Sequence, residues 1–251
     1  MSQPVLGLQL FTVREQLAED FDGTLRQVAE MGYEAVELTG TGPHTPAELR
    51  SVLDGMGLEP AGMHCGLDQL EGDLDGAIEM AQTLGMDNLV CPYLPDDRRE
   101  SREDWLGVAR SLDAIGQRCR EAGLQLSYHN HSFEFVQFDG VYALDMMLEN
   151  CAAENVYSEL DTYWVKHGGA DPVDYIHKYA GRIAILHLKD MADDEEQSFA
   201  EVGSGILDWP AIDEAARAAG VEYYCVEQDR CEGDPMDSAL KSAEFVRELL
   251  G

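Results

Sequence analysis

The stretch VYSELDTYWVKHGGADPVDYIHKYAGRIAILHLKD, residues 156–190, contains the repeating unit that predicts the fold. It begins and ends with runs rich in Val, Ile, Leu and Tyr that are short enough for buried parallel strands. Between these runs, Asp171 followed by Pro172 has the form of a helix start, with a capping side chain and a proline at the first helical position. Gly181 then marks the helix end. Strand, helix, glycine and strand in this order are typical of a parallel βαβ unit.

The same rhythm recurs along the whole chain at about 30 residues per unit. Strand-like runs lie at residues 5–11, 34–39, 59–65, 88–94, 124–131, 156–165, 183–190 and 223–229. Thr45, Pro46 and Glu48 have the form of a capping box at another helix start, and glycines at positions 32, 57, 85, 123, 181 and 220 mark helix ends. Eight units in 251 residues favour a closed (β/α)8 TIM barrel over an open doubly wound sheet.

The chain shows no linker or low-complexity tract, so residues 1–251 are predicted to form a single barrel domain. GxGxxG does not follow the first strand, which weakens a dinucleotide-binding alternative. One long irregular stretch, MADDEEQSFAEVGSGIL at residues 191–207, follows the seventh strand. A loop of this length inside a compact domain is often a functional lid, and we expect one here.

The charge balance is strongly acidic, with 49 Asp and Glu against 17 Lys and Arg and a net charge of −32. Such a surface repels phosphate backbones, so the charge argues against nucleic acid as a partner class. The charge predicts a halophilic protein of an acidic proteome, working in a high-salt cytoplasm; a strongly acidic mesophilic protein is the plainer alternative.

Other features of composition agree with a cytoplasmic protein. No apolar run approaches the roughly 20 residues of a membrane span, and the first residues have the character of a strand rather than a signal peptide. The six cysteines are scattered without CxxC pairs, as expected of reduced thiols. Assembly with further copies of the chain is left open by the sequence.

Polar side chains gather at the ends of the last four predicted strands, where barrel enzymes have their active sites. Because residues alternate between the two faces of a strand, four groups are expected to share an inner face. These groups are His129 with His131; Glu159 with Asp161 and Tyr163; His187 with Lys189; and Glu227 with Asp229. A mixed carboxylate and imidazole shell suits Mn²⁺, Co²⁺, Fe²⁺, Zn²⁺ or Mg²⁺. The pattern therefore predicts one divalent metal ion at the ends of the late strands.

An ordered set of motifs over nearly the whole chain resembles the xylose isomerase-like TIM barrel superfamily, which includes sugar phosphate isomerases and epimerases and also dehydratases. The motifs are QLFTVR at residues 9–14, YHNHSFEF at 128–135, LDTYW at 160–164, HLKD at 187–190, EVGSGILDW at 201–209 and VEQD at 226–229. The resemblance implies one metal held by an acidic residue on strand five, Asp on strand six, His on strand seven and Glu on strand eight.

Carried over by motif, the resemblance assigns Asp161, His187 and Glu227 as metal ligands. The chain departs from it on strand five, because His129 stands where many relatives have Glu, while Glu134 lies just beyond in the loop. Either His129 or Glu134 completes the metal shell, and the other is then free as an acid, base or substrate contact. Glu227 is expected to be both a ligand and a possible catalytic base.

Four further residues are expected to bind substrate: His64, His131, Trp164 and Lys189. His64 resembles a histidine that lines the site in relatives, with a hydrogen-bonded barrel-rim histidine as the alternative. Lys189 could neutralise an enediolate or bind a hydroxyl, with a salt bridge as the alternative. The aromatic face of Trp164 suits the CH-rich face of a sugar.

The predicted function is a metal-dependent isomerase or epimerase that acts through an enediolate on a keto- or aldo-sugar. A keto-sugar or inosose dehydratase or lyase is the main alternative, because all these reactions share the first proton abstraction. Two other classes remain open: an abasic-site nuclease on the same barrel, which the charge opposes, and a non-catalytic module that binds metal or sugar. The expected partner is a small sugar or polyol.

Overall fold

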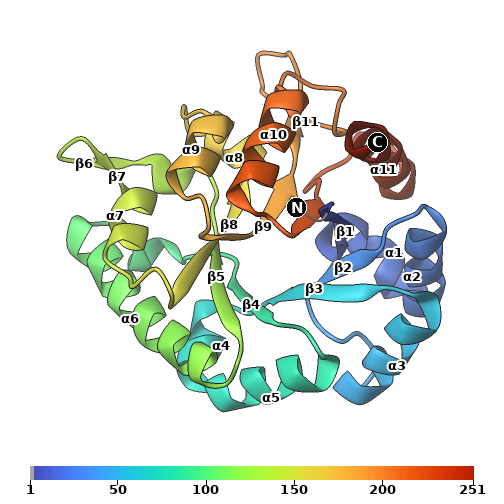
Figure 1. Cartoon of the computed structure of the whole chain (residues 1–251), viewed down its shortest axis with the longest axis horizontal. Coiled ribbons are helices and arrows are strands. Elements are labelled where there is room, and N and C mark those ends of the chain that lie inside the picture. Colours follow the sequence, from blue (N-terminus) through green and yellow to red (C-terminus); the bar gives the residue numbers. More distant parts are fainter. Residues whose placement is uncertain (1–2) are drawn as a thin grey trace.

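The computed structural model describes residues 3–251, and eight strands within them close into a parallel barrel (Figure 1). The strands are β1 (Val5–Gln9), β2 (Ala35–Leu38), β3 (Glu59–His64), β4 (Asn88–Cys91), β5 (Gln125–His129), β8 (Val156–Asp161), β9 (Ile183–Leu188) and β12 (Tyr223–Val226). Around the barrel their order is β1-β12-β9-β8-β5-β4-β3-β2, which follows the chain, and every neighbouring pair is parallel. The predicted (β/α)8 barrel is confirmed.

Helices connect the strands and lie around the outside of the barrel (Figure 1). They are α1 (Arg14–Glu19), α2 (Phe21–Glu30), α3 (Pro46–Met56), α4 (Leu67–Gly72), α5 (Leu74–Leu84), α6 (Arg102–Glu121), α7 (Ala143–Glu149), α8 (Thr162–His167), α9 (Pro172–Lys178), α10 (Trp209–Ala219) and α11 (Pro235–Leu250). Short 3-10 turns are η1 (Leu10–Val13), η2 (Asp96–Arg98) and η3 (Phe133–Phe135), and β6 (Gln137–Phe138) forms a small hairpin with β7 (Val141–Tyr142). Within residues 3–251, no helix combines the length and the apolar character that crossing a bilayer requires.

The helix boundaries follow the local signals in the sequence. Thr45 and Glu48 form a reciprocal capping box at the start of α3, and the Asp171 carboxylate accepts the N–H of Val173 at 2.9 Å at the start of α9. All six glycines expected at helix ends have positive φ, among them Gly57 at 72°. This left-handed conformation costs glycine little, so the chain can turn from each helix into the next strand.

Several strands end earlier than predicted, which changes where the polar side chains point. The clearest case is β8, which ends at Asp161 rather than continuing to residue 165. The Asp161 carboxylate accepts the Trp164 N–H at 2.8 Å, so this side chain caps a new helix, α8. Tyr163 therefore lies on a helix, and its expected place on the same strand face as Glu159 and Asp161 is wrong.

The loop after β9 is a packed wall rather than an irregular stretch. It contains β10 (Asp190–Met191) and β11 (Phe199–Ala200), which pair antiparallel. The buried Asp190 carboxylate accepts five hydrogen bonds from this region, between 2.7 and 3.2 Å. Its donors are the backbone N–H groups of residues 191, 203, 205 and 207 and the indole of Trp209. One carboxylate therefore joins the start of the loop to residues 203–209, and the role of the loop as a lid stays a prediction.

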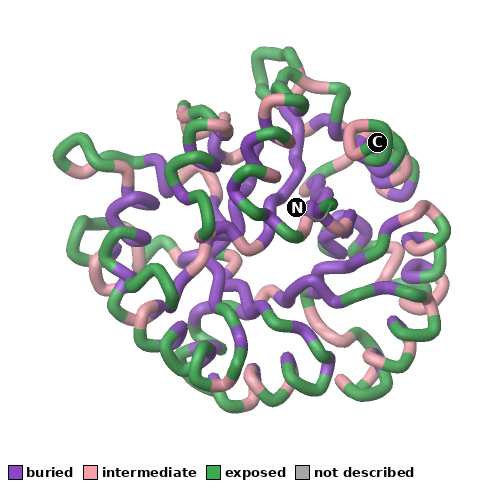
Figure 2. Tube along the Cα trace, in the orientation of Figure 1, coloured by how far each residue is buried: buried purple, intermediate pink, exposed green. Residues whose placement is uncertain are grey.

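The barrel interior is layered, since every second residue of a strand points inward. A small apolar group at the amino-terminal side consists of Ala35, Ala61, Ile185 and Cys225. Two residues further along β2, β9 and β12 come Glu37, His187 and Glu227, which are all buried. In Figure 2 the strands and inner helix faces are buried and the outer helix faces exposed. The barrel thus places a polar layer directly above an apolar one.

Candidate metal centre

Four buried side chains from neighbouring strand ends come together at the carboxyl-terminal side of the barrel. They are His129 at the end of β5, Asp161 at the end of β8, His187 on β9 and Glu227 just after β12. Each offers one ligand atom, and the four atoms lie within 4.8 Å of one another. We refer to these four residues as the ligand set. Parallel strands bring their carboxyl ends to one edge, which is why residues distant in sequence meet here.

Glu134, the competing candidate for the fourth ligand, lies outside the ligand set. It belongs to η3 and is fully buried. One carboxylate oxygen accepts the Tyr128 hydroxyl at 2.7 Å and the other accepts the His131 N–H at 2.8 Å. Burial raises the pKa of Glu134 to about 8, although both hydrogen bonds lower it. Among the described residues, the structure therefore brings His129, and not Glu134, together with Asp161, His187 and Glu227 as a group that could hold a metal ion.

The ligand set fits a divalent cation. Asp161 uses Oδ1 to cap α8, while its other oxygen, Oδ2, is buried, makes no hydrogen bond within residues 3–251 and forms an ion pair with Lys189 Nζ at 3.3 Å. Burial raises the pKa of Asp161 to about 7, against the opposing effect of Lys189. A buried carboxylate oxygen held by an ion pair alone keeps unused acceptor capacity, which a metal ion would satisfy. Two imidazoles and two carboxylates suit Mn²⁺, Co²⁺, Fe²⁺ or Zn²⁺. They suit Mg²⁺ less well, because Mg²⁺ prefers oxygen ligands to imidazole nitrogen.

Lys189 is buried beside the ligand set. Its Nζ lies 2.9 Å from Glu227 Oε2, 2.7 Å from Asp229 Oδ1 and 3.3 Å from Asp161 Oδ2. Burial alone would lower the pKa of Lys189, but the attraction of these three carboxylates raises it, so the ammonium stays charged. The Nζ also lies 5.3 Å from the centre of the Trp164 ring and 5.4 Å from that of Phe199. Lys189 therefore places a positive charge between the carboxylates and two aromatic side chains.

A cavity of about 640 Å³ opens above the ligand set. His129 and Glu227 reach it from the ligand set, and His64, His131 and Trp164 also line it. Further aromatic and basic side chains that sequence reasoning missed complete the walls: Phe11, Arg14, Tyr93, Phe199 and Arg230. The size lies in the range of small-molecule sites, and aromatic walls above polar groups are the usual composition of such sites. Lys189, expected to bind substrate, lies beneath rather than on this lining.

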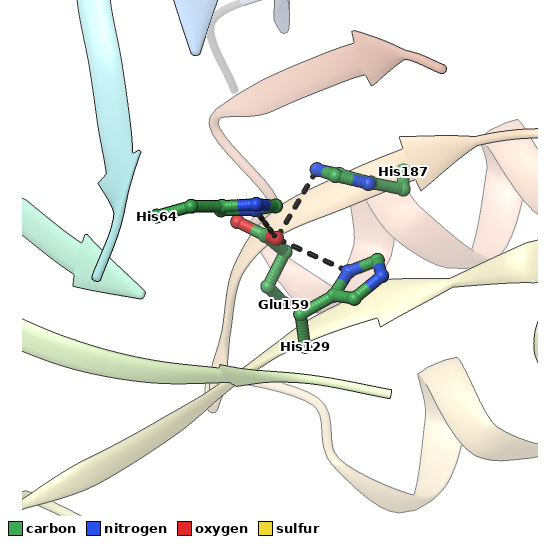
Figure 3. Close-up of side chains that lie close together, drawn as sticks. All are labelled: His64, His129, Glu159 and His187. Atoms are coloured by element: carbon green, nitrogen blue, oxygen red, sulfur yellow. Dashed lines mark hydrogen bonds and ion pairs between the residues drawn. The ribbon is translucent and has the colours of Figure 1, made fainter. Parts of the chain in front are cut away.

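Two buried glutamates lie next to the ligand set: Glu37, which sequence reasoning missed, and Glu159, which it placed on the inner strand face without a role. Glu37 on β2 and Glu159 on β8 are both fully buried. Glu37 contacts the imidazoles of His64 and His187. Glu159 contacts those of His64, His129 and His187 (Figure 3). A signal for Glu37 was present in the sequence, because an acidic residue inside the apolar run AVEL is unusual for a buried strand. We refer to Glu37 and Glu159 as the barrel carboxylates.

Fold and site together define the class of the protein. A closed parallel barrel with imidazole and carboxylate groups under a cavity at its carboxyl-terminal face is the architecture of a TIM-barrel enzyme. Residues 25–249 match the family model described as xylose isomerase-like TIM barrel, and the chain belongs to this family.

Individual relatives include enzymes with different names. An inosose dehydratase of Geobacillus kaustophilus is 28% identical, with 91% of this chain and 87% of that protein covered. Inosose dehydratases of other bacteria match over shorter spans; that of Lacticaseibacillus casei is covered over 56% of its length. A crystal structure of a sugar phosphate isomerase/epimerase from Parabacteroides distasonis superposes with a TM-score of 0.86 at 25% identity, covering 98% of this chain and 94% of that one.

A more distant neighbour contains a metal. The structure of the IOLI protein with a bound zinc atom superposes with a TM-score of 0.80 over 98% of both chains. At 16% identity this likeness concerns the fold. It shows that a barrel of this shape holds a divalent metal ion in another protein.

Proposed function

We propose that this chain is a divalent-metal-dependent sugar isomerase or epimerase that acts through an enediolate. The observation that supports it best is the ligand set of His129, Asp161, His187 and Glu227, gathered beneath a cavity of about 640 Å³. Two carboxylates and two imidazoles at the floor of an aromatic-walled cavity suit a metal that is contacted by the vicinal oxygens of a small polyhydroxy substrate.

A bound Mn²⁺, Co²⁺, Mg²⁺ or Zn²⁺ ion would polarise the substrate carbonyl and so make the neighbouring C–H bond more acidic. The protein's own groups have to hold the substrate and move its proton. Lys189 is charged but buried beneath the cavity lining, so its role is to offset the charge of Glu227 and Asp229 rather than to contact a substrate oxygen. Trp164 offers an aromatic wall to the CH-rich face of a sugar.

Proton transfer needs a group that faces the cavity and has an atom available. Glu227 lines the cavity and is the first choice as base, as the sequence indicates. Glu134 does not suit the role of a second proton-transfer group beside Glu227, because both of its oxygens accept hydrogen bonds inside the protein. His131 is better placed, since its side chain lines the cavity and does not belong to the ligand set. We propose His131, with Glu227, for the proton transfers.

Dehydration of a keto-polyol is the second candidate reaction. It begins with the same proton abstraction and then expels the β-hydroxyl, which needs a proton donor rather than a second base. The presence of His129 where a glutamate would serve a two-base epimerase favours this outcome. So do the inosose dehydratases among the similar proteins. For this chain the substrate class would then be an inosose or a related keto-polyol.

One experiment separates the two reactions. The full chain is incubated in D₂O with Mn²⁺ and a panel of aldoses, ketoses and inososes, and products are followed by NMR and mass spectrometry. Deuterium at an α-carbon with formation of an isomer supports the isomerase or epimerase. Loss of water identifies the dehydratase. Binding of a sugar without exchange or turnover on the whole panel contradicts both and favours a non-catalytic module.

We also propose that the protein works in a high-salt cytoplasm as one barrel domain. The net charge of −32 supports the high salt, and it argues against nucleic acid as a partner. All six cysteines are free thiols, which suits a reducing compartment.

A further inference from the structure

Both imidazoles of the ligand set have a buried carboxylate at a nitrogen. His187 Nδ1 lies 3.1 Å from Glu227 Oε2, whereas its Nε2 lies 2.6 Å from Glu37 Oε2. His129 Nδ1 lies 3.1 Å from Glu159 Oε1. Figure 3 shows Glu159 between the rings of His64, His129 and His187. Of the barrel carboxylates, Glu37 thus lies next to His187 and Glu159 lies next to His129.

A third histidine connects the two barrel carboxylates. His64 Nε2 lies 2.9 Å from Glu159 Oε1 and 3.3 Å from Glu37 Oε1. Glu37 and Glu159 are both 0% exposed, and neither lines the cavity. They are therefore shielded from a substrate and can influence the reaction only through the residues they contact.

The chemistry of a metal-binding imidazole explains this arrangement. When one ring nitrogen gives its lone pair to a metal, the other carries the proton and, in a buried site, needs an acceptor. A carboxylate in that position selects the tautomer, holds the ring orientation and makes the metal-binding nitrogen more basic. Glu37 occupies this position for His187, leaving Nδ1 for the ion. Glu159 Oε1 lies 3.1 Å from His129 Nδ1, next to this position but without hydrogen-bond geometry, and this leaves Nε2 for the ion.

We propose that Glu37 and Glu159 are positioning residues that hold His187 and His129 ready for the metal, with His64 fixing the two carboxylates relative to each other. This inference rests on the proposed function, because it requires one ion at the ligand set. Glu37 is 150 residues from His187 in sequence, so the closure of the barrel creates this contact.

A competing arrangement uses the same residues to hold a second ion. His64, His129, Glu159 and His187 also offer ligand atoms within 4.8 Å of one another. Two of these residues, His129 and His187, are shared with the ligand set. The 2.6 Å contact between His187 Nε2 and Glu37 takes the nitrogen that a deeper ion would need. We therefore assign the deeper group to positioning, and metal stoichiometry tests the choice.

The test compares the full chain with Glu37→Gln and Glu159→Gln. Metal content is measured after dialysis against Zn²⁺, affinity by competition with a chelator, and the ligand field by the visible absorption of the Co²⁺ form. Both variants should keep one ion per chain, bind it about 10- to 100-fold more weakly, and show a shifted Co²⁺ band. Glu159→Asp, which keeps the charge but shortens the side chain, should lose less affinity than Glu159→Gln.

Asp145→Asn is the matched control. Asp145 is also a buried carboxylate, but it accepts the hydroxyls of Tyr175 and Tyr179 on the outside of the barrel. Its loss should lower the melting temperature without changing metal affinity. His64→Asn provides a second route if a glutamine variant does not fold, and it should also weaken binding, because the barrel carboxylates lose the residue that joins them.

The outcomes separate this inference from the proposed function. If the wild type binds one ion and all the Glu37, Glu159 and His64 variants bind it with the same affinity, the positioning role is overturned and the proposed function stands. Two ions per chain, one of them lost in Glu159→Gln, also overturns it in favour of the second site. Weakened binding together with no deuterium exchange on any sugar supports positioning and contradicts the function. No bound ion in the wild type contradicts both.

Discussion

Asp161 has two roles that separate cleanly between its two oxygens. Oδ1 accepts the Trp164 N–H and caps α8, whereas the buried Oδ2 makes no hydrogen bond within the described chain and has only the Lys189 ammonium near it, at 3.3 Å. One oxygen is thus structural and the other is available to a metal. This division makes the residue suitable for a substitution that removes the ligand without removing the cap.

Asp161→Asn should abolish metal binding without unfolding the protein. The amide oxygen still caps α8, but the negative charge that attracts the cation is gone, so we expect metal affinity to fall by more than about 100-fold and turnover to fall with it. Metal content and the melting temperature of the metal-free protein measure the two effects. Asp171→Asn, at the cap of α9, is the control and should leave metal content unchanged. Full metal occupancy in Asp161→Asn would remove this residue from the ligand set.

Lys189 is expected to have opposite effects on folding and on metal binding. Lys189→Met leaves three neighbouring carboxylates without their cation, which should destabilise the metal-free protein by about 3–5 kcal/mol. Removing a positive charge beside the site should tighten divalent metal binding, by up to about tenfold or 1.4 kcal/mol. Urea unfolding and chelator competition measure the two quantities. Lys241→Met, at an exposed ion pair, is the control; weaker metal binding in Lys189→Met would contradict this view of the charge balance.

At the scale of elements, the loop after β9 depends on Asp190. Five donors from residues 191–209 converge on its carboxylate, and Phe199 of β11 reaches the cavity wall. At Gly205, an added Cβ would lie 2.2 Å from the Met191 carbonyl oxygen, so the loop backbone packs too closely for a side chain there. One buried carboxylate thus shapes a wall of the cavity.

Asp190→Asn should loosen this loop. The amide puts an N–H₂ group among N–H donors and leaves several of them unsatisfied, so we expect unfolding free energy to fall by about 3–5 kcal/mol. Urea unfolding measures the loss, and limited proteolysis should cut within residues 192–207. Asp193→Asn, exposed in the same loop, should change stability by no more than about 0.5 kcal/mol. Equal resistance of Asp190→Asn and wild type to protease would show that other contacts fix the loop.

At the scale of the whole molecule, the excess negative charge lies on the surface. Seven of the 49 acidic residues are buried: Glu37, Glu134, Asp145, Glu159, Asp161, Asp190 and Glu227. The remaining acidic side chains therefore reach solvent, where they repel one another over distances that salt screens within about 8–10 Å. The buried minority carries the site and the loop, whereas the exposed majority governs the response to salt.

Stability should consequently rise with salt. Between low salt and about 1 M KCl we expect the melting temperature to increase by at least about 5 °C, on the order of 2 kcal/mol for a chain of this size. Thermal unfolding followed by circular dichroism measures the change, and sucrose at matched osmolality is the uncharged control. A flat melting temperature across the salt series would contradict the halophilic interpretation and favour an acidic mesophilic protein.

Local sequence pattern was sufficient for the barrel and for much of the site's location. Alternating strand and helix signals, capping residues such as Thr45 and Asp171, and glycines at helix ends are short-range features, and the structure contains each of them. Asp161, His187 and Glu227 could be grouped from sequence because parallel strands align their carboxyl ends. Such inferences need only neighbours in the chain and the direction of the strands.

Contacts that form only when the barrel closes could not be predicted from the local sequence pattern. Alternation stops where a strand ends, so the turn of η3, and not the strand period, directs Glu134 toward Tyr128 and leaves His129 with the ligand set. Glu37 reaches His187 across 150 residues, and Asp190 collects donors from a whole loop. A candidate metal site among late-strand side chains is foreseeable from local rules, but the grouping of His129 with the other three residues and the carboxylates next to it exist only once distant strands are hydrogen-bonded side by side.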